Sequence, residues 1–81
     1  MNKEEITRRV FEILSERLNI LTCDIEMDSS LEELGANDWD ITEIMMDCEY
    51  EFGIEIPYAA SEGFTSVVTS VENIINYIRK H

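Results

Sequence analysis

The middle of the sequence lacks basic residues. The chain has 81 residues, with 6 Lys and Arg against 18 Asp and Glu, and a formal net charge of −12 at pH 7. All six cations lie near the two ends, and residues 18–78 contain none. Because a nucleic-acid interface needs a basic patch to bind phosphates, we expect no nucleic acid as a partner. An anionic membrane surface would repel the same segment, so we expect no membrane partner either.

Residue types that carry catalysis and metal binding are also scarce. His81 is the sole histidine and the final residue, and the two cysteines are Cys23 and Cys48. A Ser–His or Cys–His nucleophilic pair is therefore not expected, and a Cys/His metal site would need more ligands. We expect no enzyme activity, no catalytic residue and no metal site. Two cysteines make no disulfide framework, so we expect both thiols to be reduced.

Long hydrophobic runs are missing as well. No segment approaches the length of a membrane span, and no apolar block follows the charged N-terminus as it would in a signal peptide. The hydrophobic fraction of 44% is nevertheless ordinary for a folded chain. Residues 1–81 are too few for two domains. We expect one domain in the cytoplasm.

Three segments have hydrophobic residues at helical spacing. The spacing predicts helices over residues 3–17 and 38–52, and a last helix opened by the capping-box spacing of Thr69 and Glu72. Asn2 and Glu5 give a similar start to the first helix.

The connecting segments have weaker patterns. Residues 18–36 lack a sustained period and predict a long loop pinned to the core, with one helical turn beginning at Ser30. Residues 58–64 are expected to hold one short helical turn that ends at Gly63. Together the segments predict an all-α four-helix bundle with three longer helices, one short helix and a long first loop.

The predicted helix over residues 38–52 has two apolar sides. With about 100° per residue, five residues form a core-facing stripe. They are Ile41, Ile44, Met45, Cys48 and Phe52. Trp39, Met46 and Tyr50 align on the opposite side. Because a helix of a small domain needs only one buried side, the second ridge suggests a partner-binding surface. The alternative is chance exposure, since single exposed apolar residues are normal.

Acidic residues follow one flank of that second ridge. They are Asp40, Glu43, Asp47 and Glu51. Like charges at such spacing cost about 0.2–0.5 kcal/mol per pair, so a compensating use is expected. A basic protein surface would be attracted to this row. The alternative is that the acidity only keeps the protein soluble.

The same region resembles a known family. Residues 34–43 read LGANDWDITE and resemble the acyl carrier protein signature LGADSLDxVE. Residues 49–57 read EYEFGIEIP and resemble its continuation EEEFGIEIP, and residues 69–78 are similar to the last helix of the family. The resemblance implies the acyl-carrier-protein bundle, in which a serine at the start of helix two carries 4′-phosphopantetheine.

The sequence departs from the family at that serine. Asp38 stands at the position of the attachment serine, and Asn37 stands where the family usually has Asp. A carboxylate that attacked phosphorus would give a hydrolysable acyl phosphate and not a stable phosphodiester. We therefore expect no cofactor at Asp38 as written. The nearest hydroxyls, on Ser29, Ser30 and Thr42, are not expected to replace it, because a modifying enzyme positions its nucleophile narrowly.

Three hypotheses follow. The first is a binding module without the prosthetic arm, whose helix two docks through Trp39, Met46 and Tyr50 and its acidic row onto the basic surface of a carrier-dependent enzyme, namely a synthase, transferase or ligase. The second is a genuine acyl or peptidyl carrier of fatty-acid, polyketide or related biosynthesis, whose attachment serine was substituted or lies elsewhere. The third is a homodimer sealed by the Trp39 ridge. The acidity makes self-association costly, so we expect a monomer.

Overall fold

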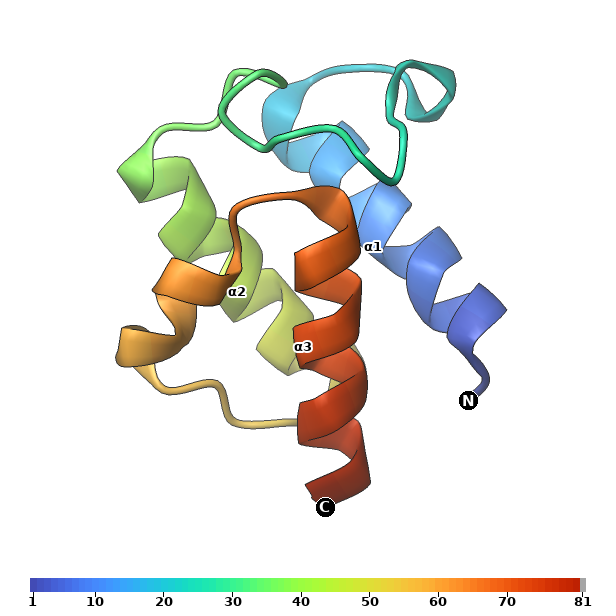
Figure 1. Ribbon diagram of the computed structural model, residues 1–81, viewed down its shortest axis with the longest axis vertical. Coiled ribbons are helices and arrows are strands. Elements are labelled where there is room, and N and C mark those ends of the chain that lie inside the picture. The colour runs from blue at the N-terminus through green and yellow to red at the C-terminus, as the bar shows by residue number, and fades with distance from the viewer. Residues whose placement is uncertain (81) are drawn as a thin grey trace.

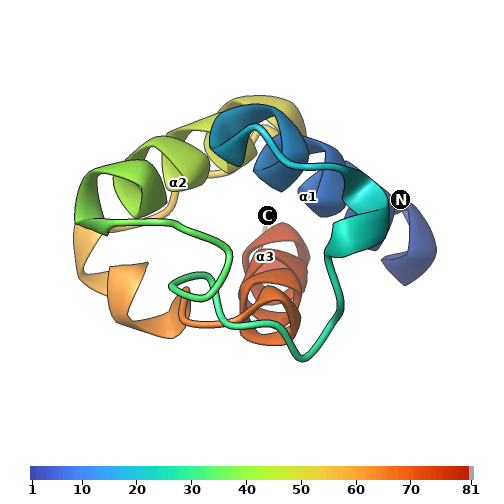
Figure 2. The ribbon, with the colours of Figure 1, turned by 90° about the horizontal axis from the view of Figure 1, so that it is seen from above.

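Three α-helices and two short 3₁₀ helices make up the fold of residues 1–80, the part of the chain that this computed structural model describes (Figure 1). The elements are, in chain order, α1 (Lys3–Leu18), η1 (Thr22–Asp24), α2 (Asp38–Phe52), η2 (Tyr58–Gly63) and α3 (Val67–Lys80). Helix α1 runs antiparallel to its neighbour α2, and α3 packs against α1, while η2 lies between α2 and α3 (Figures 1 and 2). The predicted all-α bundle with three longer helices, one short helix and a long first loop is confirmed.

The first two helices begin and end close to where the sequence predicts. At the start of α1, the Asn2 side chain accepts a hydrogen bond from the Glu5 backbone N–H at 2.9 Å, which satisfies one free donor of the first turn. At its end, Asn19 adopts the left-handed conformation. Helix α2 ends at Gly53, whose φ of 63° is one that glycine adopts without a steric penalty.

Helix α3 begins three residues earlier than predicted. Ser66, not Thr69, caps it: the Ser66 hydroxyl accepts from the Thr69 N–H at 3.2 Å, and the Thr69 hydroxyl accepts from the Ser66 N–H at 3.0 Å. The capping-box spacing of Thr69 and Glu72 therefore predicted a helix start that is one turn too late. Thr69 is the reciprocal member of the cap and not its first residue.

The long first loop lies across the start of α3 (Figure 2). Its carbonyl groups at Met27 and Ser29 accept hydrogen bonds from the N–H groups of Val68 and Val67, at 2.9 and 3.0 Å. These donors belong to the first turn of α3 and have no partner within the helix. The loop thus satisfies α3 while α3 fixes the loop. Ser30 accepts from the Glu33 N–H as its spacing suggests, and the Leu34 N–H donates to the Ser30 carbonyl at 3.2 Å, which closes a single turn over residues 31–35 that does not continue as a helix.

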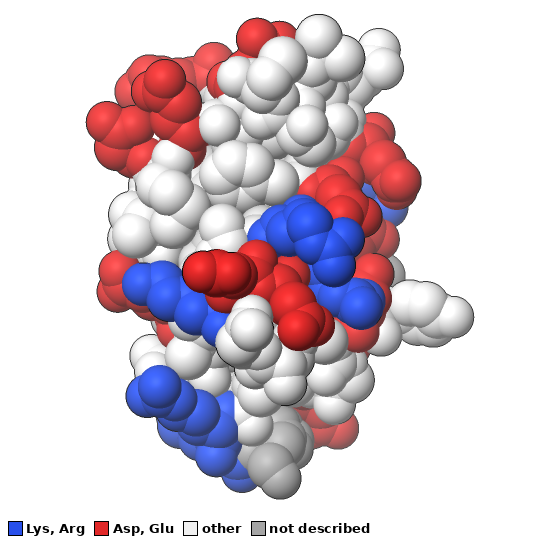
Figure 3. All heavy atoms as spheres, turned by 90° about the vertical axis from the view of Figure 1, so that its right-hand side faces the viewer, with Lys and Arg blue, Asp and Glu red and all other residues white. Residues whose placement is uncertain are grey.

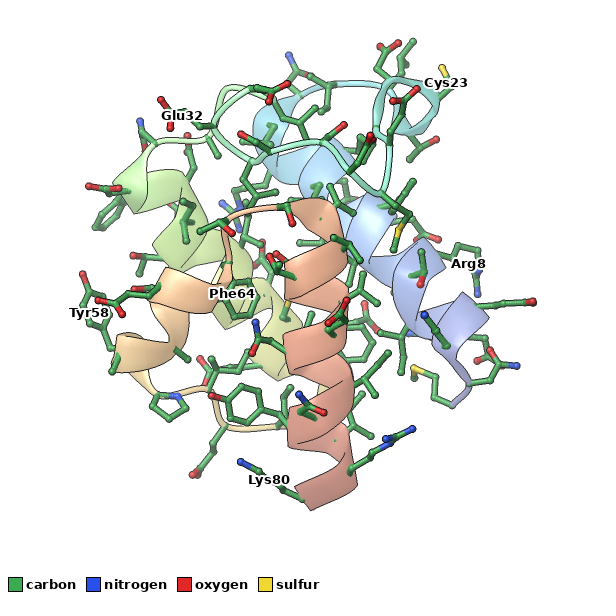
Figure 4. The ribbon with its side chains drawn as sticks, viewed as in Figure 1. Arg8, Cys23, Glu32, Tyr58, Phe64 and Lys80 are labelled. Carbon is green, nitrogen blue, oxygen red and sulfur yellow. The ribbon has the colours of Figure 1, made fainter. Side chains whose placement is uncertain are left out.

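The core is built from one face of each α-helix, from the first loop and from the segment after α2. Its fully buried members include Leu14 of α1, Ile44 of α2 and Ile74 of α3, together with Leu31 and Phe64. Phe64 points inward between η2 and the α-helices, whereas Tyr58 at the other end of η2 points outward (Figure 4). The buried side chains of Leu31 and Phe64 therefore hold the first loop and the segment after α2 against the bundle.

Segment η2 corresponds to the predicted short turn and ends at Gly63 as expected. The Asn73 side chain of α3 donates to the Gly63 carbonyl at 2.9 Å. A methyl group at Gly63 would lie only 2.6 Å from the same Asn73 nitrogen, so glycine permits this close approach. The contact fixes η2 beside α3 and so sets one wall of the groove described below.

Candidate functional site

Helix α2 is fixed at its start by a complete capping box. The Asn37 side chain accepts from the Asp40 N–H at 2.8 Å, and the Asp40 carboxylate accepts from the Asn37 N–H at 3.1 Å. Asn37 is therefore the cap, and Asp38 is the first helical residue. The exposed Asp38 carboxylate lies at the positive pole of the helix, which favours its charge. This local structure holds the first turn of α2 in one orientation.

The two apolar sides of α2 face in opposite directions, as their spacing indicates. Ile44, Met45 and Cys48 are buried, and Ile41 and Phe52 pack against the core at its edge. On the other side, Trp39 is 70%, Met46 60% and Tyr50 93% exposed. We call Trp39, Met46 and Tyr50 the outer ridge. These three large side chains lie in solvent on one helix and are not part of the hydrophobic core of the described residues.

Three acids of the row beside the outer ridge, all except Asp40, are paired with arginines of α1. Arg17 donates to both carboxylate oxygens of Asp47, at distances of 2.7 to 2.9 Å, and also binds Glu43. Arg9 binds Glu51 one helical turn further on. The hydrogen bond to Asp47 is the main reason that the Arg17 pKa lies above its ordinary value. On the face that carries α1, cations and carboxylates accordingly lie side by side (Figure 3).

Arg9 and Arg17 were not predicted as site residues, although their spacing in the sequence carries a signal. Arg9, Ile13 and Arg17 recur every four residues, which places them in one row along α1. Glu43, Asp47 and Glu51 form a row of the same period on α2. Two rows of opposite charge and equal period were a signal that antiparallel helices could bring together.

Two hollows flank the Arg17 side chain on the surface. One, of about 410 Å³, lies between α1 and the end of α2 and includes Ile13 and Tyr50 in its lining. The other, of about 220 Å³, is lined by Trp39, Met46 and Thr42 together with Glu43, Asp47 and Arg17. Arg17 and Asp47 line both. The Arg17–Asp47 pair therefore separates the Tyr50 end of the outer ridge from the Trp39 end.

A third and larger groove lies on the opposite flank of α2. It has a volume of about 540 Å³ and runs between the start of α2, the first loop and η2. Asp38, Ile41 and Thr42 line it on the helix, and Tyr58 and Phe64 line it from across. Glu32, on the loop near the start of α2, also reaches it (Figure 4). A chain attached at position 38 would meet this groove first.

The hydroxyls nearest Asp38 all take part in local hydrogen bonds. Thr42 donates to the Asp38 carbonyl at 3.1 Å, as hydroxyls within helices often do. Ser29 accepts from the Glu26 N–H and Ser30 from the Glu33 N–H, at 3.1 and 3.0 Å. Each is therefore held by its own turn.

The two cysteines occupy different environments. Cys23 is exposed in η1, whereas Cys48 is buried on the core side of α2. Burial, followed by the charge of Asp47, raises the pKa of the Cys48 thiol to about 12. Such a thiol is protonated at neutral pH and unreactive. The prediction that Cys48 belongs to the core is confirmed.

Comparison with known proteins identifies the class. Residues 8–78 match the family described as "Phosphopantetheine attachment site", so the bundle is a domain of the phosphopantetheine attachment type. Three curated relatives are each named acyl carrier protein. Those from Clostridium acetobutylicum and Prochlorococcus marinus are 38% identical over 77 residues and 39% over 75, covering 94% and 91% of this chain and 95% and 94% of the relatives. One from Rubrobacter xylanophilus is 33% identical over 82 residues, covering 100% of this chain and 96% of the relative.

The chain belongs to the acyl carrier protein family. The resemblance seen in residues 34–57 and 69–78 is thereby confirmed. Among residues 1–80, no helix has both the length and the apolar character needed to cross a membrane.

Proposed function

We propose that this chain is an acyl-carrier-protein-like binding module that is not phosphopantetheinylated at position 38 and has no enzyme activity of its own. It docks through the outer face of α2 onto the basic surface of a carrier-dependent enzyme, and it acts as a monomer. The single observation that carries the proposal is the outer ridge, three large exposed side chains on the helix that bears Asp38.

The outer ridge supplies the kind of residues on which interfaces depend. Trp and Tyr are enriched among the residues whose loss weakens binding most, and Met adapts to irregular partner surfaces. Because Glu43, Asp47 and Glu51 are already paired with arginines, their short-range contribution is smaller than an unpaired row would give. The net charge of −12 still attracts a basic partner from a distance.

Asp38 supports the part of the proposal that concerns the arm. It is exposed at the first position of α2, beside the large groove, where an attachment residue would be accessible. Its carboxylate cannot give the stable phosphodiester that a serine gives. One negative charge in this place is also compatible with docking to an enzyme that normally meets a phosphodiester.

Intact mass tests the absence of the arm. The chain and an Asp38→Ser variant are incubated with coenzyme A and a phosphopantetheinyl transferase. We expect no change in mass for the chain as written and the added mass of the arm on Asp38→Ser. A gain on the chain as written would overturn this part of the proposal, and peptide mapping would then locate the modified residue.

The affinity for a carrier-dependent enzyme tests docking. We expect Trp39→Ala to weaken binding by about tenfold or more, the effect typical of a central interface residue. Leu21→Ala is the matched control, because Leu21 is 66% exposed but lies in the first loop, outside α2. Equal effects of the two substitutions would refute docking through the outer ridge.

A genuine acyl or peptidyl carrier of fatty-acid, polyketide or related biosynthesis is the second candidate. The groove of about 540 Å³ beside position 38 favours it, since such a space could receive part of a carried chain. In that case the attachment serine was substituted or lies elsewhere. A gain of mass on the chain as written would favour this second candidate, with attachment at a residue other than position 38.

A further inference from the structure

The Arg17 guanidinium lies on the acidic row of α2, where a basic partner would be expected to bind. Its Nε and one terminal nitrogen hold Asp47, and the other terminal nitrogen binds Glu43. The fork geometry of a guanidinium suits carboxylates, so this is the arrangement that a partner arginine would itself adopt. Both members of the pair remain about one-third exposed, so the pair is accessible to a partner.

The adjoining hollow has the chemistry of a site for a cationic side chain. Trp39 and Met46 supply an aromatic surface and a polarisable apolar surface, and Glu43 and Asp47 supply negative charge. Cations bind well over the face of an indole, with carboxylates nearby adding to the attraction. The guanidinium of Arg17 already lies at one side of this hollow and shows that a cationic group can be held there.

We propose that Arg17 is an internal competitor, which competes with the cationic side chains of a basic partner for Glu43 and Asp47. When a partner Arg or Lys enters the hollow beside Trp39, it displaces the Arg17 guanidinium from Glu43 and Asp47. Until then the Arg17 contact lowers the affinity of the outer face of α2 for any cationic surface. A basic surface that makes no other contact with α2 therefore binds poorly. This inference rests on the proposed docking function and adds a regulating contact to it.

The chain offers a matched control for this idea. Arg8 is also on α1 and also bound to an acid, but its partner Glu12 lies on the same helix. Arg8→Gln and Arg17→Gln therefore change the net charge equally, while only the second releases carboxylates of α2. Arg17→Lys keeps the charge and most of the stem but loses the fork, and it covers the outcome in which Arg17→Gln fails to fold. Thermal unfolding by circular dichroism checks all three variants.

Trp39 is the sole tryptophan and so reports binding directly by its fluorescence. The probe is a synthetic amphipathic helix of Leu and Lys without aromatic residues, titrated at several salt concentrations. We expect Arg17→Gln to bind about two- to fivefold more tightly than Arg8→Gln, the range set by one exposed ion pair, with a steeper salt dependence. Arg17→Lys should lie between Arg17→Gln and the unchanged chain.

A second measurement follows the displacement itself. In the unchanged chain, addition of the peptide should shift the Nε–H resonance of Arg17 and leave that of Arg8 unmoved. Equal affinities of Arg17→Gln and Arg8→Gln, or an unmoved Arg17 resonance at saturation, would overturn the competitor role. If the affinity gain of Arg17→Gln is found but Trp39→Ala does not weaken binding to a carrier-dependent enzyme, the competitor role stands and the docking function fails.

Discussion

On α2, the side chains of Ile44, Met45 and Cys48 are buried, while those of Trp39, Met46 and Tyr50 lie in solvent. Both sets are apolar and both recur at helical spacing, so composition does not distinguish them. The buried set belongs to the hydrophobic core, to which α1, α3 and the connecting segments also contribute. The outer ridge adds nothing comparable to the fold, and the acids beside it are balanced by arginines from α1.

This difference separates two requirements on one helix. Burial of the inner set stabilises the domain, whereas exposure of the outer ridge adds no such stability and contributes apolar area to the surface. The ion pairs between α1 and α2 reduce the repulsion within the acidic row. The same arrangement leaves the apolar ridge as the part of the face that is still free to bind.

The largest expected effect is the difference in stability between substitutions of two nearby residues, Ile44 on the buried side of α2 and Met46 on the outer ridge. Ile44→Ala removes a fully buried side chain and leaves a cavity, so it should lower the free energy of unfolding by about 2–5 kcal/mol. Met46→Ala, two residues away and mostly exposed, should change it by about 0.5 kcal/mol or less. Urea unfolding of both variants measures the difference. Similar losses would mean that the outer ridge also supports the fold.

Cys48 allows the inner side to be tested by pH. Because burial raises its pKa to about 12 from 9.0, the unfolded chain loses this proton first as the pH rises. Its contribution to stability is therefore complete below pH 9 and is lost progressively above it, by about 3 kcal/mol at pH 11. Cys48→Val should lack this part of the alkaline loss.

Thermal unfolding from pH 8 to 11 measures that contribution in the two chains. Other groups also titrate in this range, so the informative quantity is the difference between the pH slopes of the unchanged chain and Cys48→Val. Parallel slopes would show that the Cys48 thiol does not remain protonated in the folded state.

The start of α2 provides a smaller contrast between adjacent residues. Asn37→Ala removes the cap and its bond to Asp40, and should cost about 1 kcal/mol of stability. Asp38→Asn is the control, because it alters the neighbouring exposed side chain and keeps the cap. Chemical denaturation should rank Asn37→Ala as the more damaging. The reverse order would mean that Asp38 stabilises the helix more than its cap does.

Local signals in the sequence predicted much of this molecule. The spacing of Ile44, Met45 and Cys48 identified the core side of α2, and the same periodicity predicted the helix over residues 38–52. These features depend on residues within one or two turns of each other, which a periodic pattern contains. The exposure of Trp39 and Tyr50 followed from the same arithmetic.

What could not be predicted depends on contacts between distant segments. Helix α3 starts at the Ser66 cap, earlier than predicted, because the loop carbonyls of Met27 and Ser29 accept the N–H groups of its first turn. The acidic row of α2 looked unpaired until the fold brought Arg17 beside Asp47, a residue 30 positions away. The size of the groove beside Asp38 likewise depends on where η2 lies, which Asn73 determines from α3. No local period encodes such partners.

The smallest expected effect concerns the charged contact between α1 and α2. Arg9→Glu places a second carboxylate beside Glu51, and Glu51→Arg places a second cation beside Arg9, so each substitution alone should lower stability. The double variant reverses the pair and should recover part of the loss, with a coupling of about 0.2–1 kcal/mol, the value typical of partly exposed pairs. Urea unfolding at low and high salt measures the cycle, and high salt should reduce the coupling. A coupling near zero at low salt would mean that Arg9 and Glu51 lie close together without stabilising the fold. Glu51 would then be free to bind a partner without competition from Arg9 at this end of the helix.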